Sequence, residues 1–423
     1  MKICPRLTLP KNQGFTLVEV MVTMVLIIAL LYFLITTVSQ TQAVMTRTTE
    51  KVAQFQSARS GFEAMTRRLS QATLNTYWRA HDNDITTATT AFKFRRQSEL
   101  HFISGPTKRF FGASPQLSNL APSVEKAYPT HAVFFQAPMG YSEDTTQVGT
   151  VRLPTFRSLD SLLSGCGYFV EYGPETERPP FLTSVKPALP DRFRFRLMEM
   201  ALPSEKLTIF QRPIDERGYV DPRVFDERNS YYAGMVKTEG QSARPSNTSW
   251  VRPLWMKEAF LRTTTTPQRF QYARVRAENI IALVILPKLA EKDRVVPGTT
   301  TADPKQLELA PAYEFDSWRI LTGKTAVEGG RSVDNTARDN LLPPIIQVTM
   351  VAVDEKAMAR FGPTATRIPT WTEGLFTKAK LVSDYTTDIQ TLEQRLIDDP
   401  YKPNYRIFTA DIVLRGSKWS RDP

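Results

Sequence analysis

The sequence predicts an α+β protein in which one long N-terminal helix, membrane-spanning in its first half, packs on an enlarged, antiparallel, β-rich head. Three observations predict this fold. Residues 15–38 form an apolar run of 24 residues with a single charge. Apolar residues then recur at helical spacing as far as residue 72. Beyond that point, short strand-like apolar runs alternate with proline-rich connections.

Composition places the chain among ordinary globular proteins. Its 423 residues are 41% hydrophobic and 23% charged, which excludes a disordered tail and a multi-span membrane protein. The 54 Lys and Arg residues against 43 Asp and Glu give a net charge of +11. The two cysteines, Cys4 and Cys166, exclude a disulfide-rich scaffold and a zinc site built from several thiolates.

The first element is a short basic leader followed by a span. Residues 1–14 carry Lys2, Arg6 and Lys11 and no acid. The run that follows exceeds the ~20 residues that a helix needs to cross ~30 Å of hydrocarbon. It is also longer than the apolar core of a secretory signal. The basic leader predicts a cytoplasmic N-terminus, with the rest of the chain on the other side of the membrane.

Glu19 is the one charge within this run. An isolated carboxylate at such depth costs roughly 2.5–3.5 kcal/mol on insertion scales. One interpretation is an acid near the helix end that reaches the interface. The other requires a partner: if the chain were cut after Gly14, the new amine of Phe15 on a neighbouring subunit could pair with Glu19.

The segment Gly14-Phe15-Thr16-Leu17-Val18-Glu19, followed by the apolar run, resembles the class III signal of type IV prepilins and type II secretion pseudopilins. This resemblance implies cleavage after Gly14 and N-methylation of Phe15 by a prepilin peptidase, with Glu19 guiding subunit assembly. It further implies a pilin-like fold and four kinds of partner: other pilin-like subunits, the peptidase, inner-membrane lipid and assembly-platform proteins. After cleavage, 51 basic and 43 acidic side chains would remain, a balance of +8.

The second half of the helix is amphipathic. No proline interrupts residues 11–105, so a single helix from Phe15 to Ala72 would be about 90 Å long. Gly61 is its weak point, at a cost of roughly 1 kcal/mol relative to Ala. The expected head-facing stripe consists of Phe55, Ala58, Phe62, Met65, Leu69 and Ala72.

The head is expected to consist of strands in two antiparallel layers. A continuous apolar run at 279–286, closed by Pro287, predicts a strand covered on both faces. Alternation at 192–197 predicts a half-buried strand whose arginines form a row on the solvent-exposed face. As an alternative, this arginine row could bind phosphate. Cys166 is expected to be a small buried side chain. The other predicted strands are 100–104, 132–136, 168–172, 345–353 and 405–414, with an amphipathic helix at 385–398.

The domain boundaries follow from these elements. We expect a leader at 1–14, a transmembrane or filament-core half-helix at 15–38 and an amphipathic half-helix at 39–78. The head is then expected to consist of two parts, 79–250 and 251–423, with an approximate boundary near residues 240–270. Two polar segments, 239–247 and 297–311, look like insertions.

The large head is similar to that of a minor pseudopilin of the J type or a large minor pilin. More narrowly, four blocks resemble the Verru_Chthon cassette protein C family, whose members carry prepilin-type N-termini. The four blocks are GYFVEYG, AENIIALVILP, LPPIIQVTMVAVDE and FTADIVLRGSKW.

Nothing in the sequence recommends an enzyme. There is no GxSxG, HExxH, P-loop or GxGxxG motif, and His81, His101 and His131 are scattered. We therefore expect no catalytic residues, no cofactor and no metal site. The acidic residues Asp82, Asp84, Glu143 and Asp144 lack a calcium-loop pattern, and Asp354-Glu355 and Asp398-Asp399 are expected to lie at element ends.

The net positive charge leaves nucleic-acid binding open as an alternative function. The pairs Arg95-Arg96 and Lys108-Arg109 lie near Phe92, Phe94, Phe110 and Phe111, and aromatic and basic residues together suit single-stranded nucleic acid. Ordinary strands with charged outer faces give the same pattern.

The sequence thus favours a minor pilin or pseudopilin subunit that is anchored in the bacterial inner membrane, with a periplasmic head, and is then built into a type II secretion or type IV pilus-like filament. One alternative is a membrane-anchored or filament-tip binding module, an adhesin or a receptor for DNA or polysaccharide. Another is a tethered hydrolase.

Overall fold

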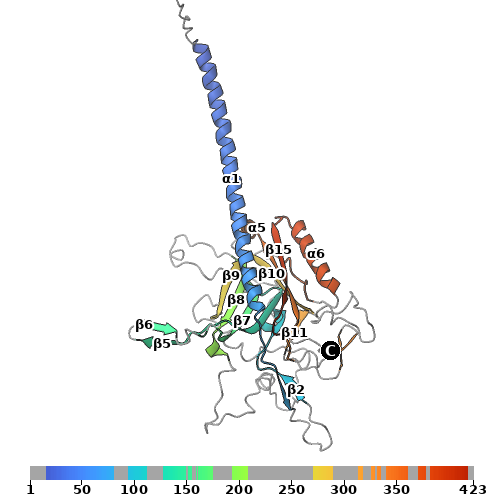
Figure 1. Ribbon diagram of the computed structural model, residues 1–423. Helices are drawn as coiled ribbons and strands as arrows, with labels where there is room; N and C mark the ends of the chain where they lie inside the picture. The colour runs from blue at the N-terminus through green and yellow to red at the C-terminus, as the bar shows by residue number, and fades with distance from the viewer. Residues whose placement is uncertain are drawn as a thin grey trace, which may run out of the picture. The chain divides into compact units, whose positions relative to one another are not determined.

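The chain forms two compact units, one ending at Gln54 and the other beginning at Phe55. The structure is a computed structural model (Figure 1). The residues it describes are 16–80, 94–111, 127–148, 151–154, 159, 161–174, 193–207, 270–288, 313–317, 325–328, 331–334, 340–360, 370–377 and 382–417.

The long N-terminal helix is present as α1, Leu17–Leu69. It begins in the first unit and its last four turns belong to the second. At its end the backbone tightens, because Gln71 N–H donates to Arg68 O at 3.0 Å and Ala72 N–H donates to Leu69 O at 3.1 Å. The prediction of one uninterrupted helix is confirmed, but the helix ends at Leu69 rather than Ala72, and the amphipathic half does not extend to 78, because a strand begins at Tyr77.

The second unit is built on two antiparallel sheets, which confirms the predicted β-rich, antiparallel class (Figure 1). The larger sheet has six strands in the order β11 (Phe315–Asp316), β3 (Ile103–Pro106), β4 (His131–Pro138), β7 (Leu163–Pro174), β8 (Phe193–Leu202) and β9 (Ala273–Glu278). The smaller has three, in the order β10 (Ile280–Lys288), β14 (Ile345–Val353) and β15 (Tyr405–Val413).

Shorter elements complete the described part of the chain. Two-stranded ribbons are formed by β1 (Tyr77–Ala80) with β2 (Phe94–Gln97), β5 (Thr145–Val148) with β6 (Val151–Pro154), and β12 (Thr325–Glu328) with β13 (Arg331–Asp334). The short helices are α2 (Lys108–Phe111), the 3₁₀ turn Ser204–Lys206, and α5 (Glu355–Arg360). The predicted insertions and the soft boundary near 240–270 lie outside the described residues.

Asn279 is the corner at which the chain passes from one sheet to the other. It lies between β9 and β10 with φ of +58°, a left-handed conformation that Asn tolerates better than most residues. Its N–H donates to Phe195 O at 2.7 Å in the large sheet, and its carbonyl accepts from Val353 N–H at 3.0 Å in the small sheet. One residue therefore hydrogen-bonds both sheets.

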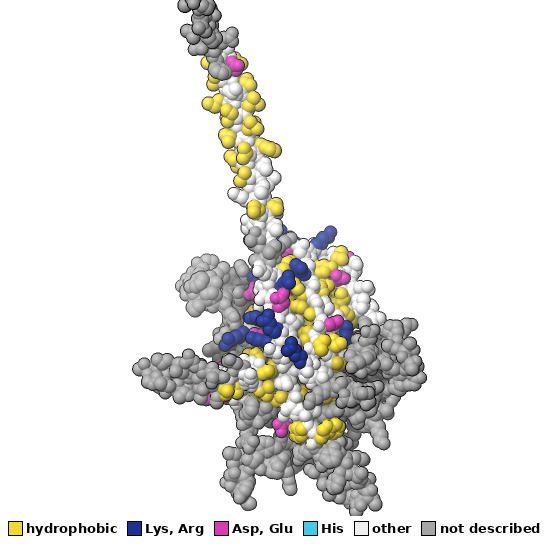
Figure 2. Space-filling view, in the orientation of Figure 1, with side chains coloured by type: hydrophobic (Ala, Val, Ile, Leu, Met, Phe, Trp, Pro, Cys, Tyr) yellow, Lys and Arg dark blue, Asp and Glu magenta, His cyan; other side chains and the backbone are white. Residues whose placement is uncertain are grey.

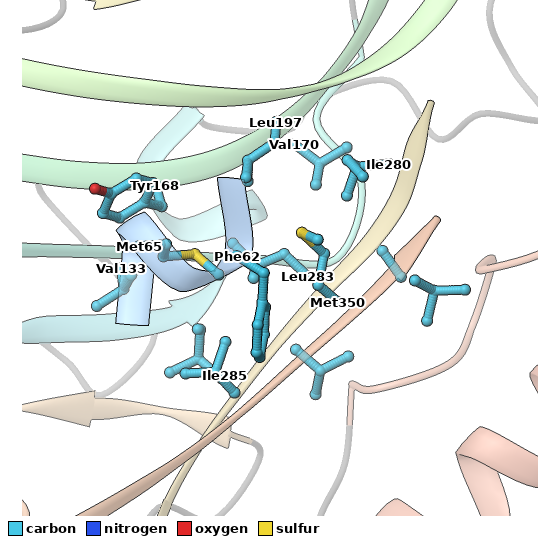
Figure 3. Packing of buried hydrophobic residues seen from close by; sticks show 14 of the residues in the cluster. Phe62, Met65, Val133, Tyr168, Val170, Leu197, Ile280, Leu283, Ile285 and Met350 are labelled. Carbon is cyan, nitrogen blue, oxygen red and sulfur yellow. The ribbon is translucent and has the colours of Figure 1, made fainter. Parts of the chain in front are cut away.

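The main core lies between the two sheets and the end of α1. Phe62 and Met65 of the helix meet Val133 and Tyr168 of the large sheet and Leu283 of the small sheet (Figure 3). Met65 and Leu69 are fully buried, and Ala58, Phe62 and Ala72 are nearly so. The predicted head-facing stripe is confirmed, with Phe55 partly buried at its start.

The opposite face of the large sheet carries a second, aromatic core. Phe111 stacks on Tyr128 with ring centroids 4.1 Å apart, and Phe110 meets Phe134 edge-on at 5.0 Å. The ring centroid of Phe169 in β7 lies 5.0 Å from that of Phe111. The middle of the large sheet is thus covered on both faces, which explains why β4 and β7 are almost continuously buried and do not alternate strictly.

The far face of the three-stranded sheet is covered by α6, Val382–Asp398. Leu392 and Leu396 are buried, and the hydroxyl of Tyr385 lies 2.6 Å from that of Thr349 in β14. This confirms the amphipathic helix predicted at 385–398. Asp398 and Asp399 lie at its end and Glu355 opens α5, so their predicted places at element ends are also confirmed.

The arginine row of β8 does not lie on a wet face, so that prediction is wrong. Arg196 is 3% exposed; its Nη2 donates to Glu171 Oε1 at 3.0 Å and to Pro174 O at 2.8 Å. Arg194 is paired with Glu278 and Glu355. The physical reason is that β8 lies inside the large sheet, where a guanidinium persists only if its charge is paired.

The outer edge of β10 is closed by side chains. Leu283 N–H donates to Thr130 Oγ1 at 3.0 Å, and Ile285 N–H donates to His131 Nδ1 at 3.0 Å. The next residue with the same orientation is Pro287, which has no N–H. The prediction of a strand covered on both faces is confirmed, since Ile280–Leu286 are fully buried, but the strand continues through Pro287 to Lys288.

Candidate functional site

The candidate site is the start of α1. Gly14 and Phe15 lie outside the described residues, and Thr16 is the first described one. Thr16 O accepts from Glu19 N–H at 3.0 Å and from Val20 N–H at 3.2 Å, and Thr16 Oγ1 lies 3.4 Å from Glu19 N. Thr16 is therefore the N-cap of the helix.

Thr16 and Glu19 have the spacing of a capping box, in which the acid occupies the third helical position. Glu19 is exposed and lies in the first turn, where the helix dipole favours negative charge. Sequence reasoning gave Glu19 either a position at the membrane interface or an intersubunit role, and did not identify this local role. The Thr-x-x-Glu pattern could also have revealed this local role at the helix start.

The surface of α1 that follows is apolar all round. Leu17–Thr46 forms a 30-residue helix segment that is long and apolar enough to cross a membrane, and its most apolar window has no buried residue. Figure 2 shows apolar side chains on every visible side of this segment. A helix that is apolar all round requires a nonaqueous environment, so this segment fits a membrane anchor. The candidate segment extends eight residues beyond Val38.

Hydroxyl groups in this segment are satisfied within the helix itself. Thr36 and Thr37 donate to Phe33 O, each at 2.8 Å, and Thr41 donates to Thr37 O at 2.8 Å. Such bonds let Ser and Thr enter lipid or a packed helix bundle without an unpaired donor. This pattern explains how residues 39–46 can extend the apolar segment.

The end of α1 is held to the large sheet by a partly buried group of polar side chains. The guanidinium of Arg68 and the hydroxyl of Tyr168 both donate to Glu199 Oε1, the latter at 2.5 Å. Burial opposes the charge of Arg68, but neighbouring Tyr168 and Glu199 outweigh this and raise its pKa. These contacts position the helix; their geometry suggests no reaction.

Cys166 lies beside this group and is fully buried with a free thiol. Burial, and then the nearby charge of Glu199, raise the pKa of its thiol to about 12. A thiol with such a pKa is almost entirely protonated at neutral pH and is a poor nucleophile. The prediction of a small buried side chain is confirmed.

Two histidines are structural. His101 Nε2 lies 2.7 Å from Asp316 Oδ1, and His131 Nε2 lies 2.7 Å from Phe376 O while its Nδ1 accepts from Ile285. His81, Asp82 and Asp84 lie outside the described residues. Within the described ranges, no three His, Cys, Asp or Glu residues are grouped to hold a metal ion.

The aromatic partners expected for nucleic acid are partly inside the protein. Phe110 is 2% exposed and Phe111 packs in the same aromatic core, so neither is available to stack on a base. Arg95 and Arg96 lie on β2, and Phe92 lies outside the described residues.

Comparison with known proteins identifies one feature. Residues 9–31 match the family model described as the prokaryotic N-terminal methylation motif. The match contains Gly14, Phe15 and Glu19. No curated protein and no solved structure matches the chain. This match, at the start of an exposed apolar helix, supports a pilin- or pseudopilin-type precursor.

Proposed function

We propose that this chain is a minor pilin or pseudopilin subunit, cleaved between Gly14 and Phe15, methylated on Phe15 and assembled through α1 into a type II secretion or type IV pilus-like filament. The observation that carries the proposal is the methylation motif, which directly precedes a wholly exposed apolar helix. The large β-rich body supports a specialised rather than a shaft-forming subunit. We place it on the periplasmic side of a bacterial inner membrane.

The proposed mechanism is assembly. In lipid, the exposed carboxylate of Glu19 is unfavourable, at roughly 2.5–3.5 kcal/mol. Beside the new amine of Phe15 on a neighbouring subunit, the same carboxylate would be paired, and the apolar surfaces of neighbouring helices would pack. The charge therefore disfavours the isolated subunit and favours one register in the assembly. No cofactor or catalytic group takes part.

The test is the mass of the N-terminal peptide of the protein isolated from membranes. We expect a peptide that begins with N-methyl-Phe15. An intact Met1 would reduce the protein to a single-pass anchored protein. A cut near Ala43 would make it a secreted soluble one. Either result would contradict the proposal.

A second candidate function is a binding module at a filament tip. Trp78 on β1 is 64% exposed and lies opposite Arg96 of β2 in the register of that ribbon. An exposed aromatic on a ribbon whose sequence also carries arginine suits DNA or an anionic polysaccharide. Salt-dependent binding of single-stranded DNA by the full-length protein, lost in Trp78→Ala, would favour this function; equal binding by the variant would exclude this ribbon.

We also propose that the chain is a member of the Verru_Chthon cassette protein C family. The four sequence blocks on which this rests contain most of β7, all of β10 except Lys288, all of β14, and β15 from Phe408 onward. They therefore lie in the core of the body rather than in its connections. Family members would then have the same strands in the same order, and a solved member with another topology would refute the assignment.

A further inference from the structure

Three of the four edge strands of the two main sheets are short or protected. Strand β11 has only two residues. Strand β9 exposes Arg274, Arg276 and Glu278, and its pairing with β8 contains a register shift. The edge of β10 is closed by side chains and a proline, as described above. Short strands, charges, irregular pairing and proline are the usual means by which proteins keep an edge from pairing with another chain.

The fourth edge, that of β15, is long and regular. The strand has nine residues, and its register with β14 runs through all nine without a shift. Tyr405–Val413 contains no proline, glycine or lysine. Among the described residues, no strand pairs with the other side of β15. This edge therefore lacks most of the devices that protect the other three.

The pairing of the small sheet shows how its backbone groups are directed. The amide hydrogens of Leu283 and Ile285 in β10 point away from β14, since they bond to side chains on the outer side. Val284 lies between them, so its backbone groups face Thr349, its partner in β14. Because backbone groups alternate in direction along a strand, those of the next residue, Met350, face β15.

The same alternation identifies the groups of β15 that point outward. The partner of Met350 is Phe408, whose backbone groups therefore face back to β14. The N–H and C=O groups of Ile407 and Thr409 then point away from the sheet, as do those of Asp411. A row of donors and acceptors at two-residue spacing matches the backbone of another extended strand.

The face of the sheet that carries α1 has an unpaired cation beside this edge. Phe408 lies on this face, where its ring centroid is 5.8 Å from that of Phe62 in α1. The guanidinium carbon of Arg406 lies over the same ring, 5.6 Å from its centroid. Arg406 is exposed, and none of the described residues forms an ion pair with it. An acidic residue on an added strand would therefore find a partner here.

The opposite face of the edge is suited to β-branched side chains. Thr409 lies on this face, with its hydroxyl 3.3 Å from that of Thr349, and Figure 1 shows α6 beside β15. Val413, four residues later, shares the face and is 66% exposed. Cross-strand pairs of β-branched residues stabilise a sheet, so an added strand should carry such residues beside Thr409 and Val413.

A second β15 strand is poorly matched to this edge. In an antiparallel pair of two β15 strands, side chains of the α1 face would meet side chains of the same face in the other copy. The residues of that face are Arg406, Phe408, Ala410 and Ile412, and none of them is acidic. The charge of Arg406 therefore favours a strand with a different sequence.

We propose that the outer edge of β15 binds, by strand addition, an extended segment of a different pilin-like subunit that places an acidic residue beside Arg406. This inference rests on the proposed function as a minor subunit and adds the head contact by which that subunit recognises its neighbour. The main-chain hydrogen bonds provide the affinity, and the side chains on the two faces select the partner.

The experiment uses the full-length protein in membranes of its native host, with Val413 replaced by a photo-crosslinking amino acid. We expect an adduct whose partner peptide, read by mass spectrometry, belongs to another chain with a prepilin-type N-terminus and carries the expected acid. Thr409→Pro should reduce the adduct about tenfold, because it removes an outward N–H without removing a backbone bond to β14. The matched control Thr409→Val loses the same hydroxyl, keeps the N–H and should retain the adduct to within about twofold.

A second variant leaves the backbone unchanged and so guards against misfolding. Arg406→Glu should reduce the adduct about fivefold, whereas Arg415→Glu, the same charge change at another exposed position, should have little effect. The inference would be overturned by an adduct within this chain or between two copies of it, by equal yields from the Pro and Val variants, or by no adduct. N-terminal mass is recorded on the same membranes: an unprocessed chain refutes the proposed function, whereas a processed chain without the adduct refutes strand addition alone.

Discussion

The ring of Phe134 in β4 lies over Gly167 in the neighbouring strand β7. The two residues are directly opposite in the register, and a Cβ built on Gly167 would lie 2.2 Å from Cδ1 and 2.6 Å from Cε1 of the ring. Phe134 therefore occupies the space that any side chain at position 167 would need. An aromatic ring over a strand glycine also covers backbone that would otherwise be poorly packed.

Gly167→Ala should destabilise the body by about 1–3 kcal/mol, the range typical of overpacking in a core. The measurement is urea unfolding of the full-length protein in detergent. In a Phe134→Leu background, the same change should cost clearly less, because the narrower side chain leaves the Cβ room. Equal costs in the two backgrounds would contradict this explanation.

Asn279→Ala should destabilise the body by roughly 1–3 kcal/mol, because alanine is strained at φ of +58° and loses the 2.7 Å bond from Asn279 Nδ2 to Glu355. Asn279→Gly should cost less, since glycine adopts this conformation without strain. Thermal unfolding of the pair gives the comparison. If the glycine variant were less stable than the alanine variant, backbone strain at position 279 would not be the main cause of the destabilisation.

Replacing Glu19 separates its local role from its proposed role in assembly. Glu19→Gln keeps a side chain suited to the capping box but removes the charge, whereas Glu19→Ala removes both. We expect both variants to insert in the membrane and both to fail to enter filaments. Cell fractionation and filament isolation measure the two steps. Normal incorporation of the Gln variant would leave only the capping role.

Cys166 should resist alkylation in the native protein at pH 9 and react once the protein is unfolded. Its folded pKa of about 12 lies above the unfolded value of about 8.5. The neutral thiol therefore contributes stability that is fully present below pH ~8.5 and is lost as the pH rises towards 12, by at most ~1.4 kcal/mol per pH unit. A Cys4→Ser background restricts labelling to Cys166. Cys166→Ala should reduce the alkaline loss of stability, and an unchanged loss would contradict this assignment.

The apolar patterns predicted the elements whose structure depends mainly on residues close together in the sequence. Residues 279–286 and 345–353 became β10 and β14 because continuous apolar runs are unsuited to any exposed position, and 405–414 became the edge strand β15, which is mostly half-buried or exposed. The same reasoning failed for the arginines of β8. Alternation states which residues share a face, but pairing of Arg196 with Glu171 depends on a neighbouring strand 25 residues away.

The candidate site was predictable because its residues are contiguous. Gly14, Phe15 and Glu19 carry a linear signal, and the family model matches the same stretch. The polar contact that holds the end of α1 was not predictable in this way. Arg68 and Glu199 are 131 residues apart in the sequence, and only the folded body brings them together.

The closed edge of β10 has a consequence for aggregation. Ile280–Leu286 is an uncharged, β-branched-rich segment of the kind that stacks into amyloid when its backbone is accessible. Thr130 and His131 bind two of the amide hydrogens through which another strand would add, and Pro287 offers none. These three residues therefore act as gatekeepers: they leave few amide hydrogens on this edge for an added strand, which protects this apolar strand against nucleating fibrils.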